Sequence, residues 1–192
     1  MKRFTLLLLN LLLFTCSKSL FAQNDQDAMM KAWTAYMTPS DVHKMIAKAD
    51  GDWNTSLTMW MDPKGKPVTS TGTCTNKMVM GGRYQESTFS GNFMNMPMEG
   101  KGTLGYDNTK KIFQSTWIDN FGTGIMVVSG TWDDATKTMN LSGVQTDPMS
   151  GKDIKVRETF KIIDDKNQEM DMYMSPDGTN EFKSMHIKFT RK

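Results

Sequence analysis

Apolar and polar residues alternate at every second position over most of the chain from Trp53 to its end. Such a period of two is typical of strands with one buried face. Turn-forming residues interrupt it at short intervals, namely at residues 62–66, 81–82, 107–110, 119–122, 133–137, 147–151, 164–167 and 176–178. Short, evenly spaced turns join consecutive strands into antiparallel hairpins. We therefore predict eight to ten antiparallel strands, and no helix-length segment separates them as parallel strands would require.

The first and last of these strands carry matching inward faces. The first face contains Trp53, Leu57, Met59 and Met61, and the last contains Met185, Ile187, Phe189 and Arg191. If the sheet closes on itself these strands pair, with Trp53 and Arg191 at the same end as a barrel-closing pair. Closure also removes exposed strand edges, and the short turns do not supply the crossovers of a sandwich. The predicted fold class is all-β, an antiparallel up-and-down closed barrel.

One short helix is predicted before the first strand. Thr38 is the expected N-cap, Pro39 occupies the first helical position, and apolar residues follow at helical spacing until Gly51. This predicts a helix over residues 39–50, with a narrow apolar stripe suited to a lid at one end of the sheet. Residues 23–37 show no clear period and are interpreted as a mobile lead-in.

The first 22 residues have the pattern of a secretory signal peptide. A basic start precedes an apolar run over residues 4–14, and small residues lead to a cut between Ala22 and Gln23. That run is too short to span a bilayer, and no later stretch is long and apolar enough. We expect an exported protein, periplasmic or extracellular, without a transmembrane segment. A lipoprotein anchored through Cys16 is the lesser alternative. Residues 38–192 are expected to form one domain.

The charge balance changes when the signal peptide is removed. The precursor has 23 basic and 21 acidic residues, and cleavage removes Lys2, Arg3 and Lys18, so 20 − 21 gives a net charge of −1. A nearly neutral chain without a basic run offers no footprint for nucleic acid. Cys74 is left as a single cysteine, so the protomer has no internal disulfide and depends on packing. Nothing in the sequence fixes the oligomeric state.

A series of short motifs resembles a known bacterial family. In chain order they are Gly81-Gly82-Arg83, Pro97-Met98-Glu99-Gly100, Gly105-Tyr106-Asp107, Trp117-Ile118-Asp119, Asp147-Pro148 before Gly151, and Arg191-Lys192. Together they look like the domain of unknown function 1579 family, which is regarded as calycin-like. A helix followed by Gly51-Asp52-Trp53 similarly resembles lipocalins, where that Trp packs beneath a late Arg. The resemblance implies a lipocalin-like barrel and supplies no activity; the methionine-rich run over residues 93–98 departs from it.

Enzyme chemistry is the weaker interpretation. His43 and His186 are the only histidines, and His186 is expected on the outer face of the last strand. No nucleophile elbow, phosphate-binding loop or zinc motif is present. Most aspartates fall in turns, where their side chains bond backbone amides, although Asp107 and Asp119 stand beside aromatics at strand ends. No catalytic residue is assigned and no cofactor is expected.

A ligand pocket inside the barrel is the first functional hypothesis. Glu158 alternates with apolar residues on an inward face, where a carboxylate needs a partner or a ligand, and Arg83 is its candidate partner. An internal structural ion pair and a ligand-orienting pair both fit. The candidate pocket residues are Arg83, Tyr106, Trp117, Glu158, Tyr173 and Met59. The expected ligand is small and largely apolar.

Methionines supply the alternative. The chain has 19, many at every second position, and soft thioether sulfurs select Cu(I). A copper-binding site would use Met94, Met96 and Met98. Flexible methionines also suit the lining of an adaptable apolar interior, which we favour. A third hypothesis is an envelope interaction protein with a solid core and a functional outer surface.

Overall fold

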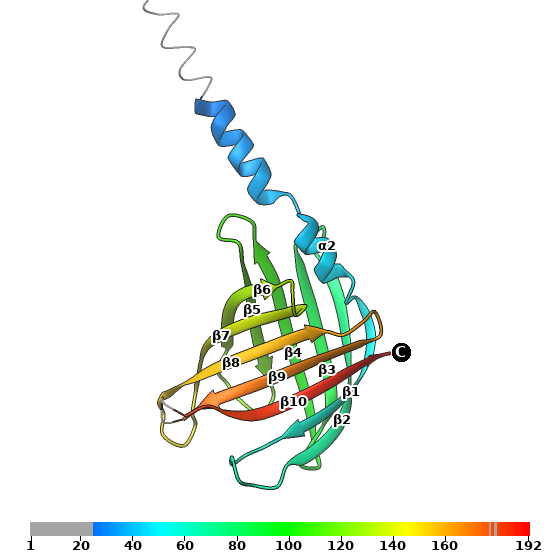
Figure 1. Cartoon of the computed structure of the whole chain (residues 1–192), viewed down its shortest axis with the longest axis vertical. Coiled ribbons are helices and arrows are strands. Elements are labelled where there is room, and N and C mark those ends of the chain that lie inside the picture. The colour runs from blue at the N-terminus through cyan, green and yellow to red at the C-terminus, as the bar shows by residue number, and fades with distance from the viewer. Residues whose placement is uncertain (1–24, 177, 179) are drawn as a thin grey trace, which may run out of the picture. The chain divides into compact units, whose positions relative to one another are not determined.

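A computed structural model describes residues 25–176, 178 and 180–192 (Figure 1). The chain divides into two compact units, with the boundary between Thr38 and Pro39. The predicted signal peptide at residues 1–22 lies outside the described residues. In the part of the chain that is described, no helix has both the length and the hydropathy needed to cross a membrane.

Residues 25–37 form a helix, which the absence of a clear period in the sequence did not predict. Its residues need no periodic apolar stripe to become helical, because intrinsic propensity favours the helix. Ala and Met, both good helix formers, make up six of its 13 residues, and Asp25 and Asp27 occupy the first turn, where negative charge is favoured. The large apolar side chains of the helix are exposed: Met29, Met30, Trp33, Tyr36 and Met37.

The second unit is a closed barrel of ten antiparallel strands, as predicted. Neighbours in sequence are neighbours in space all the way round, and β10 closes the barrel against β1. The strands are β1 (Gly51–Met59), β2 (Val68–Val79), β3 (Tyr84–Phe93), β4 (Met96–Asp107), β5 (Ile112–Asp119), β6 (Met126–Asp133), β7 (Thr138–Thr146), β8 (Asp153–Ile162), β9 (Asn167–Ser175) and β10 (Phe182–Arg191).

The pairing of β1 with β10 shows which residues of these two strands face inward. Trp53 lies opposite Arg191 and Met59 opposite Met185, with the strands antiparallel between them. A register shift between Lys183 and Met185 on β10 marks a β-bulge. Met61 does not continue the inward face of β1, contrary to prediction, because the strand ends at Met59 and leaves Met61 70 % exposed.

The strand count depended on the segment between Gly91 and Gly105. It folds into two strands joined by a two-residue turn, in which Met94 has φ 50° and Asn95 has φ 64°. Two successive positive φ values are typical of the hairpin turns that match the twist of the flanking strands. Asn accepts this conformation readily, but Met does not, which is why the sequence shows no clear turn signal here.

Helix α2 (Asp41–Ala47) covers one end of the barrel (Figure 1). It begins later than predicted because Ser40, not Thr38, is its N-cap, with the Ser40 backbone N–H donating to His43 Nδ1 at 3.0 Å. Ile46 is buried against a core cluster of strand residues: Phe113, Val128, Met139 and Leu141. The chain after the helix is also tied to the wall, because Met78 N–H donates to Asp50 Oδ2 at 2.9 Å. We call this the closed end.

Candidate functional site

The interior of the barrel is lined largely by methionines. Strand register places these thioethers on the inward faces: Met59, Met78, Met98, Met126, Met139, Met170, Met172, Met174 and Met185. Met139 and Met172 are buried, but the others are only half-buried although they face inward. These inward thioethers therefore keep partial contact with solvent.

Two inward aromatic rings lie along the wall, over glycines. A Cβ on Gly100 would stand 2.2 Å from a ring carbon of Trp117, and one on Gly72 would stand 2.9 Å from the ring of Phe89. The ring of Trp117 is also held by its Nε1–H, which donates to Asp119 Oδ2 at 2.8 Å. These glycines therefore let large rings lie close to the sheet instead of projecting towards the axis.

Glu158 is the one acidic side chain buried on the inward face of β8. It lies between Leu141 of β7 and Met172 of β9 in the register and is 9 % exposed. Within the described residues no hydrogen bond or ion pair reaches its carboxyl group. Burial raises its pKa to about 7, since the charged form is disfavoured away from water.

The expected partnership of Arg83 with Glu158 does not form. Arg83 belongs to the turn between β2 and β3, where its Nη1 donates to the carbonyl of Met80 at 2.9 Å. Gly81 and Gly82 allowed this turn to be predicted from the sequence. They did not indicate which group the side chain of Arg83 would bond. Glu158 therefore lacks the compensating charge that the sequence analysis assigned to it.

Two further inward polar groups have no partner, and the sequence analysis missed both. Thr55 on β1 and Gln168 on β9 are each 4 % exposed, and Thr55 Oγ1 and Gln168 Oε1 have no hydrogen-bond partner among the described residues. Phe189 of β10 stands between them in the register. Thr55 lies two residues from Trp53, so this pair is near the closed end. The one sequence feature that could have identified Thr55 and Gln168 is that each is a polar residue at an inward-facing position of its strand.

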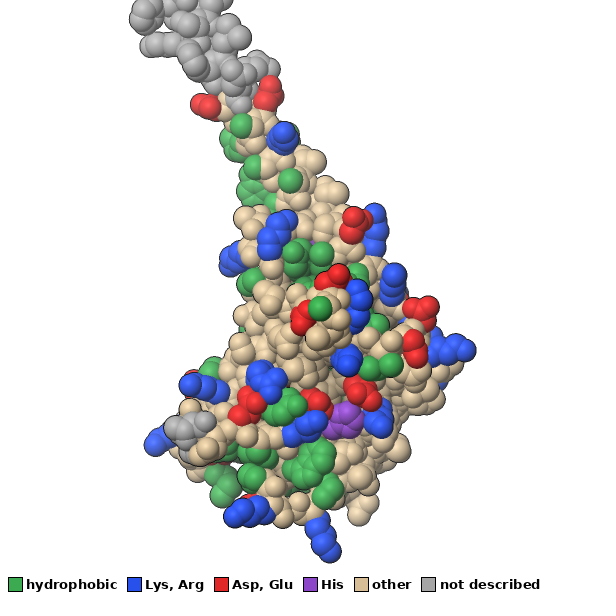
Figure 2. All heavy atoms as spheres, in the orientation of Figure 1, with side chains coloured by type: hydrophobic (Ala, Val, Ile, Leu, Met, Phe, Trp, Pro, Cys, Tyr) green, Lys and Arg blue, Asp and Glu red, His purple; other side chains and the backbone are tan. Residues whose placement is uncertain are grey.

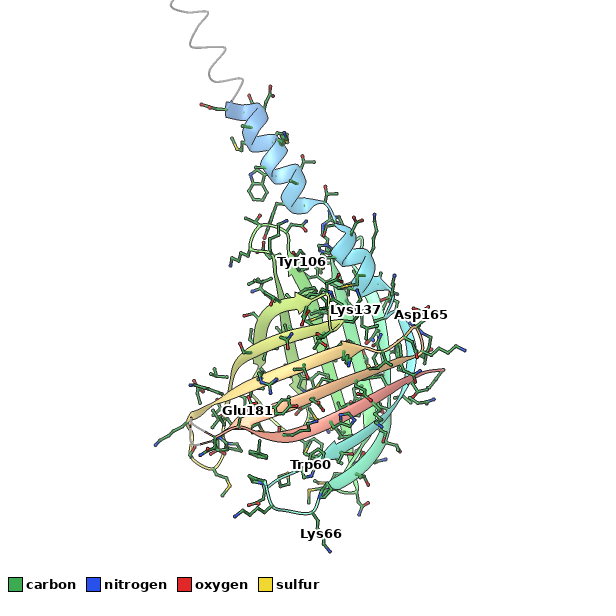
Figure 3. The ribbon with its side chains drawn as sticks, viewed as in Figure 1. Trp60, Lys66, Tyr106, Lys137, Asp165 and Glu181 are labelled. Carbon is green, nitrogen blue, oxygen red and sulfur yellow. The ribbon has the colours of Figure 1, made fainter. Side chains whose placement is uncertain are left out.

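The remaining predicted pocket residues separate into two groups. Tyr106 and Met59 face inward, as Trp117 does, and Tyr106 lies near the closed end, with its ring 4.9 Å from that of Phe113 (Figure 3). Tyr173 faces outward, because it alternates with the inward Met172 and Met174, and Arg157 covers its ring at 3.9 Å. Tyr173 therefore does not line the interior.

The outer wall of β8, β9 and β10 carries a polar cluster (Figure 2). Asp171 Oδ2 accepts from Lys183 at 2.8 Å, and its Oδ1 lies 2.7 Å from His186 Nδ1. Partial burial would raise the pKa of Asp171, but Lys183 and His186 outweigh it and hold that pKa below its ordinary value. Arg157 pairs with Glu181 through two hydrogen bonds.

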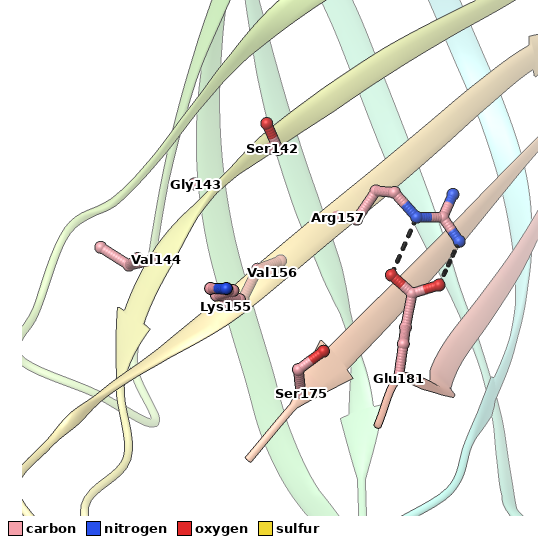
Figure 4. A pocket seen from close by; sticks show the side chains of 8 residues that line it. All are labelled: Ser142, Gly143, Val144, Lys155, Val156, Arg157, Ser175 and Glu181. Carbon is pink, nitrogen blue, oxygen red and sulfur yellow. Dashed lines mark hydrogen bonds and ion pairs between the residues drawn. The ribbon is translucent and has the colours of Figure 1, made fainter. Parts of the chain in front are cut away.

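Beside this cluster is a hollow of about 360 Å³ (Figure 4). It is lined by Ser142, Gly143, Val144, Lys155, Val156, Arg157, Ser175 and Glu181. Lys155 and Arg157 alternate with the buried Val156, so the hollow lies on the outside of the wall. Its cationic side chains face solvent, and Arg157 is already paired.

The end opposite α2 has exposed apolar side chains at its loops. They are Met61 (70 % exposed), Met94 (57 %), Phe121 (42 %), Ile125 (67 %) and Met149 (95 %). Trp60, Lys66 and Glu181 also lie at this end, which we call the open end (Figure 3). Within the described residues no helix covers it.

The two aspartates singled out beside aromatics act in turns. Asp107 Oδ1 accepts from the backbone N–H groups of Thr109 and Lys110, both at 2.8 Å. Asp119 Oδ1 accepts from the N–H of Phe121 at 2.9 Å, in addition to the bond from Trp117. Each carboxylate thus has a structural role that accounts for its position.

The methionines of the copper alternative do not form one cluster. Met94 lies in the turn after β3, Met96 is 49 % exposed at the start of β4, and Met98 packs against the cluster of Trp53, Cys74 and Phe89. Burial raises the pKa of the Cys74 thiol to about 11 and keeps it protonated, which is unsuited to metal ligation.

Comparison with known proteins gives a family and a fold. The family model described as "Protein of unknown function (DUF1579)" matches residues 38–191. No curated protein matches the chain. The crystal structure of Rv2717c from M. tuberculosis is similar, with a TM-score of 0.63 and 13 % identity over 81 % of this chain and 99 % of that chain. A redesigned β-barrel, b11L5F_LGL, gives a TM-score of 0.39 at 15 % identity over 76 % and 92 % of the two chains.

Proposed function

The chain belongs to the DUF1579 family, whose function is unknown, and from this premise we propose that it binds a small, largely apolar ligand inside its barrel. The observation that carries the proposal is Glu158, an inward carboxyl group that is 9 % exposed and has no partner in the described part of the chain. An isolated buried carboxyl destabilises a fold, so a role in binding accounts for its presence better than packing does.

The lining supports an apolar ligand of adaptable shape. Methionine side chains are unbranched and polarisable, so a surface made of them adjusts to different apolar partners. Together with the ring of Trp117 they supply much of the apolar surface of the inward faces, which also carry polar side chains, Glu158 among them. Apolar walls with a few convergent polar groups are the usual composition of small-molecule sites.

The open end is the proposed entrance. Helix α2 and its hydrogen bonds to the wall occupy the closed end, including the bond from Trp53 Nε1 to the carbonyl of Ala49 at 2.9 Å. Exposed apolar side chains at the open end, such as Ile125 and Met149, would contact an apolar ligand on its way in. Export from the cytoplasm is part of the proposal, and it rests on the signal-peptide pattern of residues 1–22.

Intact-mass measurement tests the proposal. Protein purified natively from an exporting host should show an added mass of organic size under native conditions that is absent under denaturing conditions. The purified protein should also take up the uncharged fluorophore N-phenyl-1-naphthylamine. A bare mass in both spectra with no uptake of the fluorophore would reject the proposal and favour a protein that acts through its outer surface, while an added mass of copper would revive the methionine alternative.

A further inference from the structure

The inward faces offer no free cation for an anionic ligand. In the ten described strands no lysine faces inward, and Arg191 is the one inward arginine. Each of its three nitrogens already donates a hydrogen bond: Nη1 to Asp50 O at 2.6 Å, Nη2 to Lys48 O at 2.5 Å and Nε to Asp165 O at 2.9 Å. The same group covers the ring of Trp53 at 4.3 Å. A carboxylate inside the barrel would find no counter-charge.

The interior instead carries a carboxyl group of its own. Glu158 faces Leu141 and Met172 from the neighbouring strands, neither of which is charged. Other titratable groups on the inward faces are Cys74, Tyr106 and Asp119, and Asp50 and His43 lie at or next to α2. Among these described groups none bonds Glu158, so nothing neutralises it when it is ionised. An anion would meet repulsion there, whereas a neutral molecule would not.

The unpaired atoms near the closed end match an uncharged head group. Gln168 Oε1 needs a donor, and Thr55 Oγ1 can both donate and accept. A hydroxyl group also both donates and accepts, so it satisfies either side chain. Leaving such buried atoms unpaired is costly, and a ligand that pairs them recovers that cost on binding.

On these grounds we propose that the interior selects an uncharged amphiphile, an apolar chain with a terminal hydroxyl group, seated with its hydroxyl beside Thr55 and Gln168, and that it discriminates against the corresponding carboxylate. This proposal rests on the proposed function and goes further by naming the ligand class. The apolar chain would follow the inward methionines past Met172 towards the open end.

A displacement assay with matched twelve-carbon competitors tests the selection. The wild-type protein is loaded with N-phenyl-1-naphthylamine at about pH 8, and the fluorophore is displaced by 1-dodecanol or by dodecanoate. Dodecanol should act at concentrations at least about tenfold lower, because the ionised Glu158 repels the carboxylate. At about pH 6 the difference between the competing concentrations of dodecanol and dodecanoate should become smaller, since Glu158 has a pKa of about 7 and is then mostly protonated. In Glu158→Gln the affinity for dodecanoate should no longer change between these pH values.

A second comparison tests the position of the hydroxyl group. Dodecyl methyl ether has the same chain and keeps the oxygen, but it cannot donate a hydrogen bond. The wild type should prefer dodecanol to the ether by about fivefold, and Gln168→Leu should lose that preference. Gln145→Leu is the matched control: Gln145 also faces inward, but on β7, where its Nε2 donates to Met174 Sδ at 3.9 Å. Gln145→Leu should keep the preference for dodecanol over the ether.

The outcomes separate this inference from the proposed function. If the wild type takes up no fluorophore, both fail. If the fluorophore binds but dodecanoate competes as well as dodecanol at about pH 8, the proposed function stands and the selection for uncharged amphiphiles is overturned. If Gln168→Leu and the wild type prefer dodecanol to the ether equally, the placement of the hydroxyl group beside Gln168 is contradicted.

Discussion

At the scale of single residues, two inward polar side chains have opposite consequences for stability. Arg191 donates hydrogen bonds to three carbonyls, whereas Glu158 makes none among the described residues. The first joins β10 to the segment after α2 and to the turn before β9. The second is a destabilising group that the barrel retains. Substitutions at the two positions should therefore act in opposite directions.

Replacing Glu158 by Gln should remove a pH dependence of stability. Its pKa is about 7 in the folded protein against an ordinary 4.5, so the folded state binds the proton more tightly than the unfolded state. The free energy of unfolding should then fall as the pH rises from 4.5 to about 7, by about 3 kcal/mol, which is 2.5 × 1.36. Urea unfolding across this range should show the loss in wild type, and Glu158→Gln should be flatter and more stable above pH 7.

The exposed Glu86 on β3 provides the control for that experiment. Glu86→Gln should keep the wild-type pH profile, because its side chain is not buried. Parallel profiles for wild type and Glu158→Gln would show that Glu158 is not the source of the effect.

Replacing Arg191 by Lys should destabilise the fold although the charge is kept. An ammonium group cannot reproduce the planar fork that reaches three carbonyls while it covers Trp53, so we expect a loss of about 1–3 kcal/mol in the free energy of unfolding. Arg83→Lys is the matched control, since Arg83 bonds one exposed carbonyl, and it should change stability by less than about 0.5 kcal/mol. Equal effects of the two substitutions would contradict the role of the fork.

At the scale of elements, β1 shows how one strand separates the interior from the outer surface. Met59 faces the interior near the open end, and Thr58, one residue earlier, faces outward opposite His186. Because successive side chains on a strand point to opposite faces, Met59 and Thr58 form a matched pair for testing whether the interior binds the fluorophore.

Met59→Trp should weaken uptake of N-phenyl-1-naphthylamine by about tenfold or more, because the larger side chain occupies part of the path from the open end. Thr58→Trp should leave uptake unchanged. Fluorescence titration measures both, and thermal unfolding checks that the two variants remain folded. Equal affinities in the two variants would argue that the fluorophore binds elsewhere, such as the outer hollow beside Arg157.

At the scale of the whole barrel, the two ends differ in how they are covered. The closed end is held by hydrogen bonds from wall residues to α2 and the residues after it, as from Gln85 Nε2 to the carbonyl of Ile46 at 2.9 Å. The open end has loops with exposed apolar side chains, among them Met149 and Ile125. The closed end also has exposed apolar side chains, Met80 (71 %) and Ile163 (49 %), so what distinguishes the two ends is the helix bonded to one of them. A barrel with one end secured in this way suits passage of a ligand through the other.

The sequence by itself determined the architecture. Alternation from Trp53 onward and the regular turn signals predicted antiparallel hairpins and a closed barrel, and the structure has them, because strand period and turn chemistry are local properties of the chain. The same alternation placed Glu158 inside the barrel. Pattern analysis did not predict the helix at residues 25–37, because that helix has no apolar stripe and so no periodic signal. It also did not predict the turn at Met94, because methionine rarely adopts a positive φ.

Only the tertiary structure decided which polar groups find partners. Arg83 bonds its own turn instead of Glu158, and Arg191 bonds three carbonyls. Thr55 Oγ1 and Gln168 Oε1, on either side of Phe189, have no partner among the described residues. Hydrogen bonding depends on distances between strands far apart in sequence, and these follow from how the barrel closes and where β10 bulges. The alternation of residues can say which side of a strand a group faces, but the closed barrel alone sets what it meets there.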